Sequence, residues 1–254
     1  MSDTQRLDKA LVGQGLAANR SQAGNYIALG KVKVNGKAAA KSGQMVKSDD
    51  RLELDVPEGE RYVSRAALKL ASVVEPLKID FKDKLVLDVG SSTGGFSDFA
   101  LKHGARAVVA VDVGTEQMHP SLRYEPRLEL HEKTDIRGFE MAEKPDIVLA
   151  DLSFISLREV LPAVGALSNS STQILVLLKP QFEAGKSQIN RGIVKNDSLR
   201  RQIIKDFEGW LISNFLIVAK ADSAVAGARG NRERFYLLRL LATNRTQGSR
   251  YRAK

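Results

Sequence analysis

From residue 84 onward, short runs of Val, Leu and Ile alternate with segments of helical periodicity. The clearest of these runs are "KLVLDVG", "ARAVVAVDVG", "KPDIVLADL" and "TQILVLLKP", followed by "NFLIVAKAD" and "RFYLLRLL". The early runs are almost continuously apolar, which is typical of parallel strands covered on both faces. The alternation predicts a doubly wound, mostly parallel, seven-stranded Rossmann-like α/β sheet. No long helical pattern separates the last two runs, so we expect that pair to be antiparallel.

Residues 1–56 follow a different pattern and predict a small α+β domain. Asn19 and Gln22 have the spacing of a capping box, and the helix that they begin should finish at Gly30. "KVKVNGK" then alternates apolar and basic residues up to an Asn35-Gly36 pair, a strong hairpin signal. The next segment, residues 57–63, contains Pro57 and Gly59 and predicts a linker.

The stretch "NRSQAGNYIALGKVKVNGK" resembles the RNA-binding module of ribosomal protein S-four. Such modules bind structured RNA through phosphate contacts and shape. The resemblance therefore implies that basic residues of this domain bind RNA. We expect these to be Arg6, Arg20, Lys31, Lys33 and Lys37. The alternative is a solvated basic face on an ordinary small domain.

The charge distribution agrees with a polyanionic partner. The 254 residues include 39 Lys and Arg against 30 Asp and Glu, a formal net charge of +9. Residues 1–47 hold eight basic and two acidic residues, and residues 245–254 hold four basic and no acidic ones. Two basic ends favour nucleic acid as the partner, although a protein can also be basic without such a partner.

Several classes of protein are disfavoured by composition. No apolar run approaches the ~20 residues of a membrane helix, so we expect no membrane association. The charged N-terminus is unlike a signal peptide, which favours a cytoplasmic location. There is no cysteine, which excludes disulfides and Cys-based metal sites, and we expect no metal.

A glycine-rich loop follows the first strand of the sheet, in "LVLDVGSSTGGFSDFALKHG". Small residues at the carboxyl end of a parallel strand let the backbone approach a cofactor closely. The spacing matches neither a dinucleotide loop nor a Walker loop, so an adenosine cofactor without pyrophosphate, S-adenosylmethionine, fits better. The loop residues expected to bind it are Gly90, Ser91, Ser92, Gly94, Gly95 and Phe96. A generic turn is the alternative.

Three aspartates at strand ends extend this interpretation. Asp112 ends the second strand, where a carboxylate can accept both hydroxyls of a ribose. Asp88 begins the loop and can hold a cationic amino group. Asp135 follows the third strand, where it can approach the adenine amine or, about as well, cap the next helix.

Four further ionisable residues are predicted to converge at the same edge of the sheet. Asp151 and Lys179 end the fourth and fifth strands, Lys69 comes from the helix before the first strand, and Glu233 begins the last strand. A ribose 2′-hydroxyl is a poor nucleophile until its proton is removed, and a lysine oriented by carboxylates can remove it. The alternative is a buried salt-bridge network.

The chain as a whole resembles the TlyA/haemolysin-A family of rRNA 2′-O-methyltransferases. The motifs that carry the resemblance are "RYVSRAALKL", "DVGSSTGGFSD", "AVDVGTEQMHP", "DLSFISL", "LLKPQFEAG" and "GNRERF". The family joins an S-four-like module to a methyltransferase domain of the RrmJ (FtsJ) class, which here implies residues 64–243. It implies a catalytic tetrad of Lys69, Asp151, Lys179 and Glu233, and a cytidine target in ribosomal RNA or ribosomal subunits. Residues 244–254 form a basic tail outside the pattern.

Other residues of these motifs have further expected roles. Arg234, between Glu233 and the apolar run, departs from the family pattern and leaves the aim of Glu233 open. Phe154 and Phe182 can stack on a base, but core packing is the expected explanation for each. Further candidates for phosphate contacts are Arg65, Arg229 and Arg232.

Three rival functions remain. A non-catalytic RNA-binding or ribosome-assembly factor would not need all four tetrad positions, and a membrane-lytic protein would need an apolar segment of membrane length. A pseudouridine synthase can share the N-terminal module but has no use for the cofactor loop or Lys179.

Overall fold

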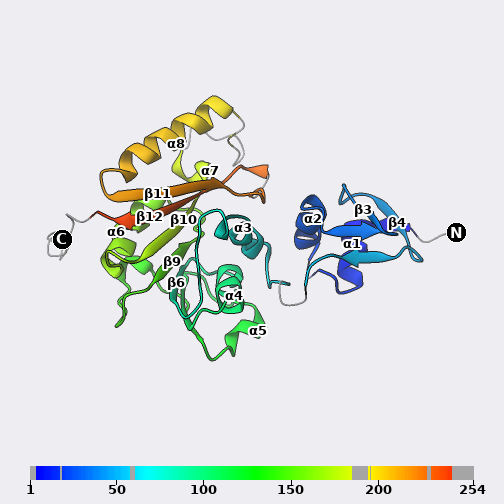
Figure 1. Ribbon diagram of the computed structural model, residues 1–254, viewed down its shortest axis with the longest axis horizontal. Helices are drawn as coiled ribbons and strands as arrows, with labels where there is room; N and C mark the ends of the chain where they lie inside the picture. The colour runs from blue at the N-terminus through cyan, green and yellow to red at the C-terminus, as the bar shows by residue number, and fades with distance from the viewer. Residues whose placement is uncertain are drawn as a thin grey trace. The chain divides into compact units, whose positions relative to one another are not determined.

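The computed structural model describes residues 4–17, 19–57, 61–184, 194, 196–227 and 230–241. The chain divides into two compact units, Met1–Leu68 and Lys69–Lys254 (Figure 1). The division falls within helix α3 (Arg65–Val74), beyond the predicted linker. Tyr62 belongs to the first unit because its carbonyl accepts a hydrogen bond from Gln22 Nε2 at 2.6 Å.

The first unit contains two helices and two small sheets. Asn19 caps the second helix through a bond from the Gln22 amide, as the sequence predicts. The left-handed φ angles of Asn35 (51°) and Gly36 (77°) form the predicted hairpin turn. The elements are β1 (Thr4–Arg6), α1 (Leu7–Gly13), α2 (Arg20–Ala28), β2 (Val32–Val34), β3 (Lys37–Ala38), β4 (Met45–Lys47) and β5 (Leu52–Leu54). They pair as β1-β4 and as β3-β2-β5.

The second unit is built on a seven-stranded sheet in the order β11-β12-β10-β9-β6-β7-β8. The five strands β6 to β10 are parallel, and β12 is antiparallel to both of its neighbours. The strands are β6 (Leu85–Val89), β7 (Ala107–Val111), β8 (Leu128–His131), β9 (Ile147–Ala150), β10 (Gln173–Leu178), β11 (Phe215–Asp222) and β12 (Arg234–Leu240). The predicted fold class is confirmed. The final pair is antiparallel as expected, but the reversed strand β12 lies inside β11 and is not the edge strand.

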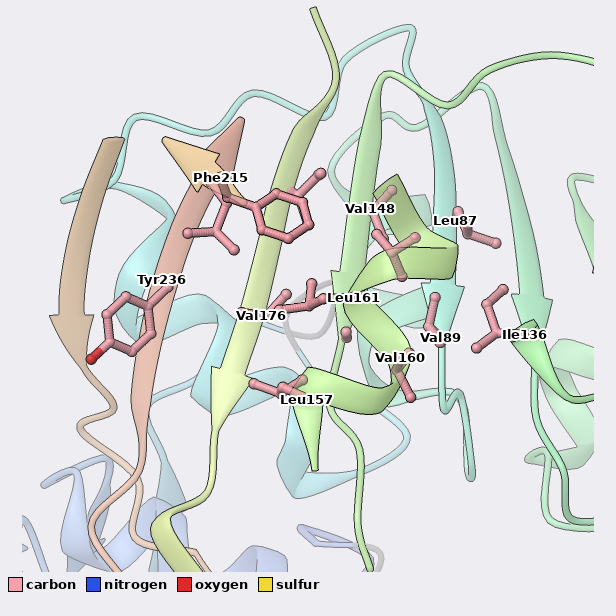
Figure 2. Close-up of a cluster of buried hydrophobic side chains, with 14 of the residues drawn as sticks. Leu87, Val89, Ile136, Val148, Leu157, Val160, Leu161, Val176, Phe215 and Tyr236 are labelled. Atoms are coloured by element: carbon pink, nitrogen blue, oxygen red, sulfur yellow. The ribbon is translucent and has the colours of Figure 1, made fainter. Parts of the chain in front are cut away.

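Helices cover the central strands β6, β7, β9 and β10 because these are buried on both faces. Figure 2 shows Leu157, Val160 and Leu161 of α6 among side chains from β6, β9, β10, β11 and β12. Besides α3, the helices are α4 (Gly95–Lys102), α5 (Pro120–Arg123), the 3-10 turn η2 (Ile136–Gly138), α6 (Leu157–Leu167), α7 (Pro180–Glu183) and α8 (Asp197–Leu211). None of the helices in the described ranges has both the length and the apolarity needed to cross a bilayer.

Candidate active site

The carboxyl ends of the central parallel strands meet at one edge of the sheet. Strand order runs outward from β6 through β7 to β8, and outward from β9 to β10 on the other side. The order therefore reverses between β6 and β9. In open α/β sheets ligands bind at this reversal, outside the carboxyl ends of the strands. The loops after β6, β7, β9 and β10 are thus the loops that can build a site.

The loop after β6 makes a tight turn that requires glycine at two positions. Gly90 has φ +79° and Gly94 has φ +84°. A Cβ atom at Gly90 would lie 2.8 Å from Leu152 Cδ2, in the loop after β9. A Cβ atom at Gly94 would lie 2.4 Å from Met118 Sδ. The glycines therefore let this loop pack closely against its neighbours while its backbone changes direction.

The remaining loop residues lead directly into helix α4. Ser92 also has a left-handed φ angle, of 46°. Gly95 begins the helix, and Phe96 is buried with its ring 6.2 Å from that of Phe235.

Asp88, near the end of β6, is a buried carboxylate, and only one of its two oxygens has a hydrogen-bond partner among the described residues. Its Oδ2 accepts a 2.6 Å hydrogen bond from the Ser97 hydroxyl. Oδ1 is buried and has no hydrogen-bond partner among the described atoms, and the same holds for Ser91 Oγ. Burial raises the pKa of Asp88 to about 7, with repulsion from Asp151 and Asp112 adding to the rise and Ser97 opposing it. A buried oxygen in this state favours a ligand that brings a donor or a positive charge.

Asp112, directly after β7, is fixed by two backbone amides. Its Oδ2 accepts from the Ser92 amide at 2.8 Å and its Oδ1 from the Gly114 amide at 2.7 Å. Each carboxylate oxygen keeps a second acceptor direction. The half-buried side chain is therefore oriented and still able to accept the hydroxyls of a ligand.

Asp135, after β8, caps the turn η2. Its side chain accepts from the Arg137 amide and forms an ion pair with the Arg137 guanidinium. The hydrogen bonds and the charge of Arg137 lower the pKa of Asp135. This is the capping arrangement that the sequence offered as the alternative, and the adenine contact stays a prediction.

The structure brings the four ionisable residues together in one chain of contacts. Lys179 Nζ lies 2.7 Å from Asp151 Oδ1. Lys69 Nζ lies 3.8 Å from Asp151 Oδ2 and 2.7 Å from Glu233 Oε2. The exposed fraction of the four side chains is 9% for Lys179, 14% for Asp151, 5% for Lys69 and 2% for Glu233. Two positive and two negative groups balance, which makes this degree of burial tolerable.

Glu233 reaches Lys69 despite the arginine that follows it. Arg234 opens β12 and pairs with Asp222 of the neighbouring strand β11. Because successive side chains along an extended chain point to opposite faces, the side chains of Arg234 and Glu233 point in different directions. A Cβ atom at Gly227 would lie 2.0 Å from Glu233 Oε1, so a larger residue at this position would force the carboxylate to move.

The loops after β9 and β10 are joined by several side chains that sequence reasoning missed. Lys179 donates a 2.9 Å hydrogen bond to the Ser153 hydroxyl. The Glu183 carboxylate accepts bonds from the Ser156 hydroxyl at 2.6 Å and the Leu157 amide at 2.7 Å. Both partners lie at the start of α6, so the hydrogen bonds of Glu183 connect α7 to α6. Such contacts between loops leave no periodic signal in a sequence.

The prediction that Phe154 packs in the core is wrong. The Phe154 residue is 92% exposed and has a left-handed φ angle of 69°. Its ring lies 5.3 Å from that of the half-buried Phe182, which in turn lies 5.9 Å from Lys179 Nζ. An irregular loop conformation turns Phe154 out of the core, and no local pattern in "DLSFISL" indicates this.

Two of the basic residues expected to bind RNA share a carboxylate. Arg6 and Arg20 both donate to Asp8, whose side chain is only 6% exposed, while theirs are 45% and 53% exposed. The hydrogen bonds from Arg6 hold the pKa of Asp8 well below its usual range. Lys31 and Lys37 are exposed.

The other basic candidates differ in their surroundings. Lys33 lies 3.7 Å from Asp55, and Arg65 donates to the Ser21 hydroxyl at 3.3 Å. Arg232 is exposed and pairs with Asp197. Arg229 and the tail 244–254 lie outside the described residues.

Comparison with known proteins assigns this arrangement to a family. The model of the FtsJ-like methyltransferases matches residues 62–240. The chain belongs to this family. A second model, the S4 domain, matches residues 5–52, where the S-four resemblance was expected. This chain is therefore a methyltransferase that carries an S4 RNA-binding domain.

Individual relatives extend over most of this FtsJ-like methyltransferase. The 16S/23S rRNA (cytidine-2′-O)-methyltransferase TlyA of Mycobacterium tuberculosis is 38% identical, over 94% of this chain and 91% of its own. The 23S rRNA (cytidine-2′-O)-methyltransferase TlyA of Campylobacter jejuni is 42% identical, over 74% of each chain. A solved structure from Streptococcus thermophilus, named as a hemolysin, has a TM-score of 0.68 at 33% identity and covers 95% of this chain and 90% of its own. The predicted resemblance to the TlyA family is confirmed.

Proposed function

We propose that this chain uses S-adenosylmethionine to methylate the 2′-hydroxyl of a ribose in ribosomal RNA, on a cytidine. The observation that carries the proposal is the contact chain Lys179–Asp151–Lys69–Glu233 at the strand ends. The names of the TlyA relatives support the reaction and the nucleotide. A ribosomal RNA substrate also favours a cytoplasmic location.

The residues around the glycine turn fit S-adenosylmethionine. Asp88 Oδ1 and Ser91 Oγ are buried acceptors without partners among the described atoms, and an amino group would satisfy them. Asp112 is held with free acceptor directions at the place where a ribose would lie. The backbone at Gly90 and Gly94 can approach the cofactor closely. We further expect contacts from the other predicted loop residues, Ser92, Gly95 and Phe96, and from Asp135.

S-adenosylmethionine supplies a methyl group on a positively charged sulfur, which makes that carbon an acceptor for an oxygen nucleophile. In this proposal Lys179 Nζ would take the proton from the ribose 2′-hydroxyl while the ribose oxygen bonds to the methyl carbon. The bond from that carbon to sulfur would break at the same time and leave a neutral thioether. Asp151 stabilises the ammonium group that results, since its carboxylate lies 2.7 Å away. Lys69 contacts the other oxygen of Asp151, and Glu233 in turn holds Lys69. Because these side chains are buried, little reorganisation is needed during the reaction.

The S4 domain would hold the RNA. Arg6, Arg20, Lys31, Lys33 and Lys37 are the proposed phosphate contacts, with Arg65, Arg229 and Arg232 contributing from outside the module. Phe154 would stack on a base, which is supported by its exposure and by its contact with Phe182, whose ring lies near Lys179. In this scheme residues 1–56 bind RNA, 57–63 connect, 64–243 catalyse, and 244–254 add positive charge.

The direct test is incubation of the protein with methyl-labelled S-adenosylmethionine and ribosomal subunits, followed by mapping of 2′-O-methyl groups. We expect label on one or a few cytidines. RNA binding without transfer of label to any subunit or free rRNA would instead indicate a non-catalytic RNA-binding or assembly factor. Label on bases only would exclude the ribose as the acceptor.

A further inference from the structure

The amine of Lys179 has a second partner besides Asp151. Its Nζ donates to Ser153 Oγ at 2.9 Å, in addition to lying 2.7 Å from Asp151 Oδ1. A lysine ammonium has three donor directions. Two of them are therefore taken by groups from the loop after β9, and none of the residues that the structure describes takes the third. A long, flexible lysine side chain held by one partner can still turn about that contact, whereas two partners fix its direction.

The loop that carries Ser153 is held in an unusual conformation. Phe154, the next residue, has φ 69°, and a left-handed residue other than glycine costs about 1–2 kcal/mol. Such a conformation persists when the surroundings over-determine it. Here the ring of Phe154 contacts that of Phe182. Further along the loop, Ser156 and Leu157 donate hydrogen bonds to Glu183, so the loop is held at both places. The location of the Ser153 hydroxyl beside Lys179 is thus imposed by the loop.

We propose that Ser153 is a positioning residue that directs the third position of the Lys179 amine, which no described residue occupies, toward the ribose hydroxyl. This rests on the proposed 2′-O-methyltransferase function. Ser153 acts through Lys179 and takes no proton itself. When Lys179 has given up a proton, the neutral amine can still donate to Asp151 and Ser153, and its lone pair occupies the third position.

The exposure of Ser153 makes this proposal testable without loss of the fold. Ser153 is exposed, so its hydroxyl is not part of the packed core, and Lys179 keeps Asp151 as a partner when that hydroxyl is removed. Ser153→Ala removes the acceptor, and Ser153→Thr keeps it. Ser171 offers a matched control, because it is also exposed but precedes β10, whereas Lys179 follows the opposite end of that strand.

The experiment compares the full-length protein with Ser153→Ala, Ser153→Thr and Ser171→Ala in transfer of labelled methyl groups to ribosomal subunits. For Ser153→Ala we expect kcat to fall about tenfold while both KM values stay within about twofold. The acid limb of the pH–rate profile should also move to lower pH, because the lost hydroxyl accepts a bond from the charged amine. Ser153→Thr and Ser171→Ala should stay within about threefold of the unchanged protein.

The outcomes separate this inference from the function on which it rests. If the unchanged protein transfers methyl groups and Ser153→Ala has the same kcat and pH profile, Ser153 does not position Lys179. A Ser153→Thr variant as slow as Ser153→Ala would also overturn the proposal, because the hydroxyl would not be the group that matters. If the unchanged protein modifies no ribose, the proposed function itself fails.

Discussion

Each unit of this protein holds a largely buried carboxylate between two basic side chains, but the two arrangements differ in how exposed the basic side chains are. Asp151 lies between Lys69 and Lys179, whose side chains are 5% and 9% exposed. Asp8 lies between Arg6 and Arg20, whose side chains are 45% and 53% exposed. Glu233 neutralises the first group, while in the described part of the chain Arg6 and Arg20 share Asp8 alone.

The two arrangements suit positive charge to two different tasks, proton transfer at short range and attraction of phosphate at longer range. A balanced, buried set has no net charge to attract a distant polyanion, but it can hold one amine in place for a short-range proton transfer. A half-exposed pair with one positive charge in excess attracts phosphate at longer range, and this attraction is weakened by salt. Guanidinium groups also suit phosphate geometry better than ammonium groups. The comparison predicts that changes in the two groups affect different steps.

The largest effect is expected from Lys179→Ala. Loss of the amine should lower kcat for methyl transfer by about a thousandfold or more, while S-adenosylmethionine affinity stays within a few-fold, because in the proposed mechanism the lysine takes a proton and does not bind the cofactor. Single-turnover assays and calorimetry measure the two quantities. Turnover near that of the unchanged protein at neutral pH would show that Lys179 is not the base.

The next effect concerns the arginine pair. Replacing Arg6 and Arg20 together by Gln should weaken RNA binding by about tenfold or more at low salt and reduce the slope of log K against log salt by about one to two. Lys205→Gln, on the exposed face of α8, is the matched control. An unchanged slope in the arginine variant would mean that neither arginine contacts phosphate, whatever happens to kcat.

Because of Asp88, the stability of the free protein and its affinity for S-adenosylmethionine should change with pH in opposite directions. Its pKa of about 7 lies above the usual value of 3.8, so the free fold binds an extra proton between these values. Its contribution to stability is therefore greatest below pH 4 and is lost as pH rises through 7. Affinity for the amino group of S-adenosylmethionine should instead increase as pH rises through 7. Asp88→Asn should flatten both trends, in thermal denaturation and in calorimetry, and persistence of either trend would assign it to another group.

The smallest effect is expected from Phe154→Ala. Because this residue is 92% exposed, the melting temperature should stay within about 2 °C of that of the unchanged protein. The KM for RNA should rise several-fold if the ring stacks on a base, since such stacking is worth about 1–3 kcal/mol. A large loss of stability with unchanged KM would show that the ring serves packing.

Much of the fold follows from local patterns. Strand and helix alternation predicts the parallel sheet, and sheet connectivity then places Asp88, Asp112, Asp151 and Lys179 at one edge without any knowledge of side-chain contacts. The interior position of β12 was not predicted, because strand order depends on pairings between distant segments. The pairing of β12 with β11 places Arg234 beside Asp222, and the preceding Glu233 reaches Lys69.

The sequence by itself determined the elements, the strand-end residues, and signals such as the Asn19 cap and the Asn35-Gly36 turn, since these depend on neighbours within a few positions. Only the tertiary structure decided that Arg6 and Arg20 share Asp8, that Phe154 faces solvent, and that Ser153 meets Lys179. These contacts arise where irregular loops from distant parts of the chain pack together. Their geometry is set by the whole fold, and no local periodicity encodes it.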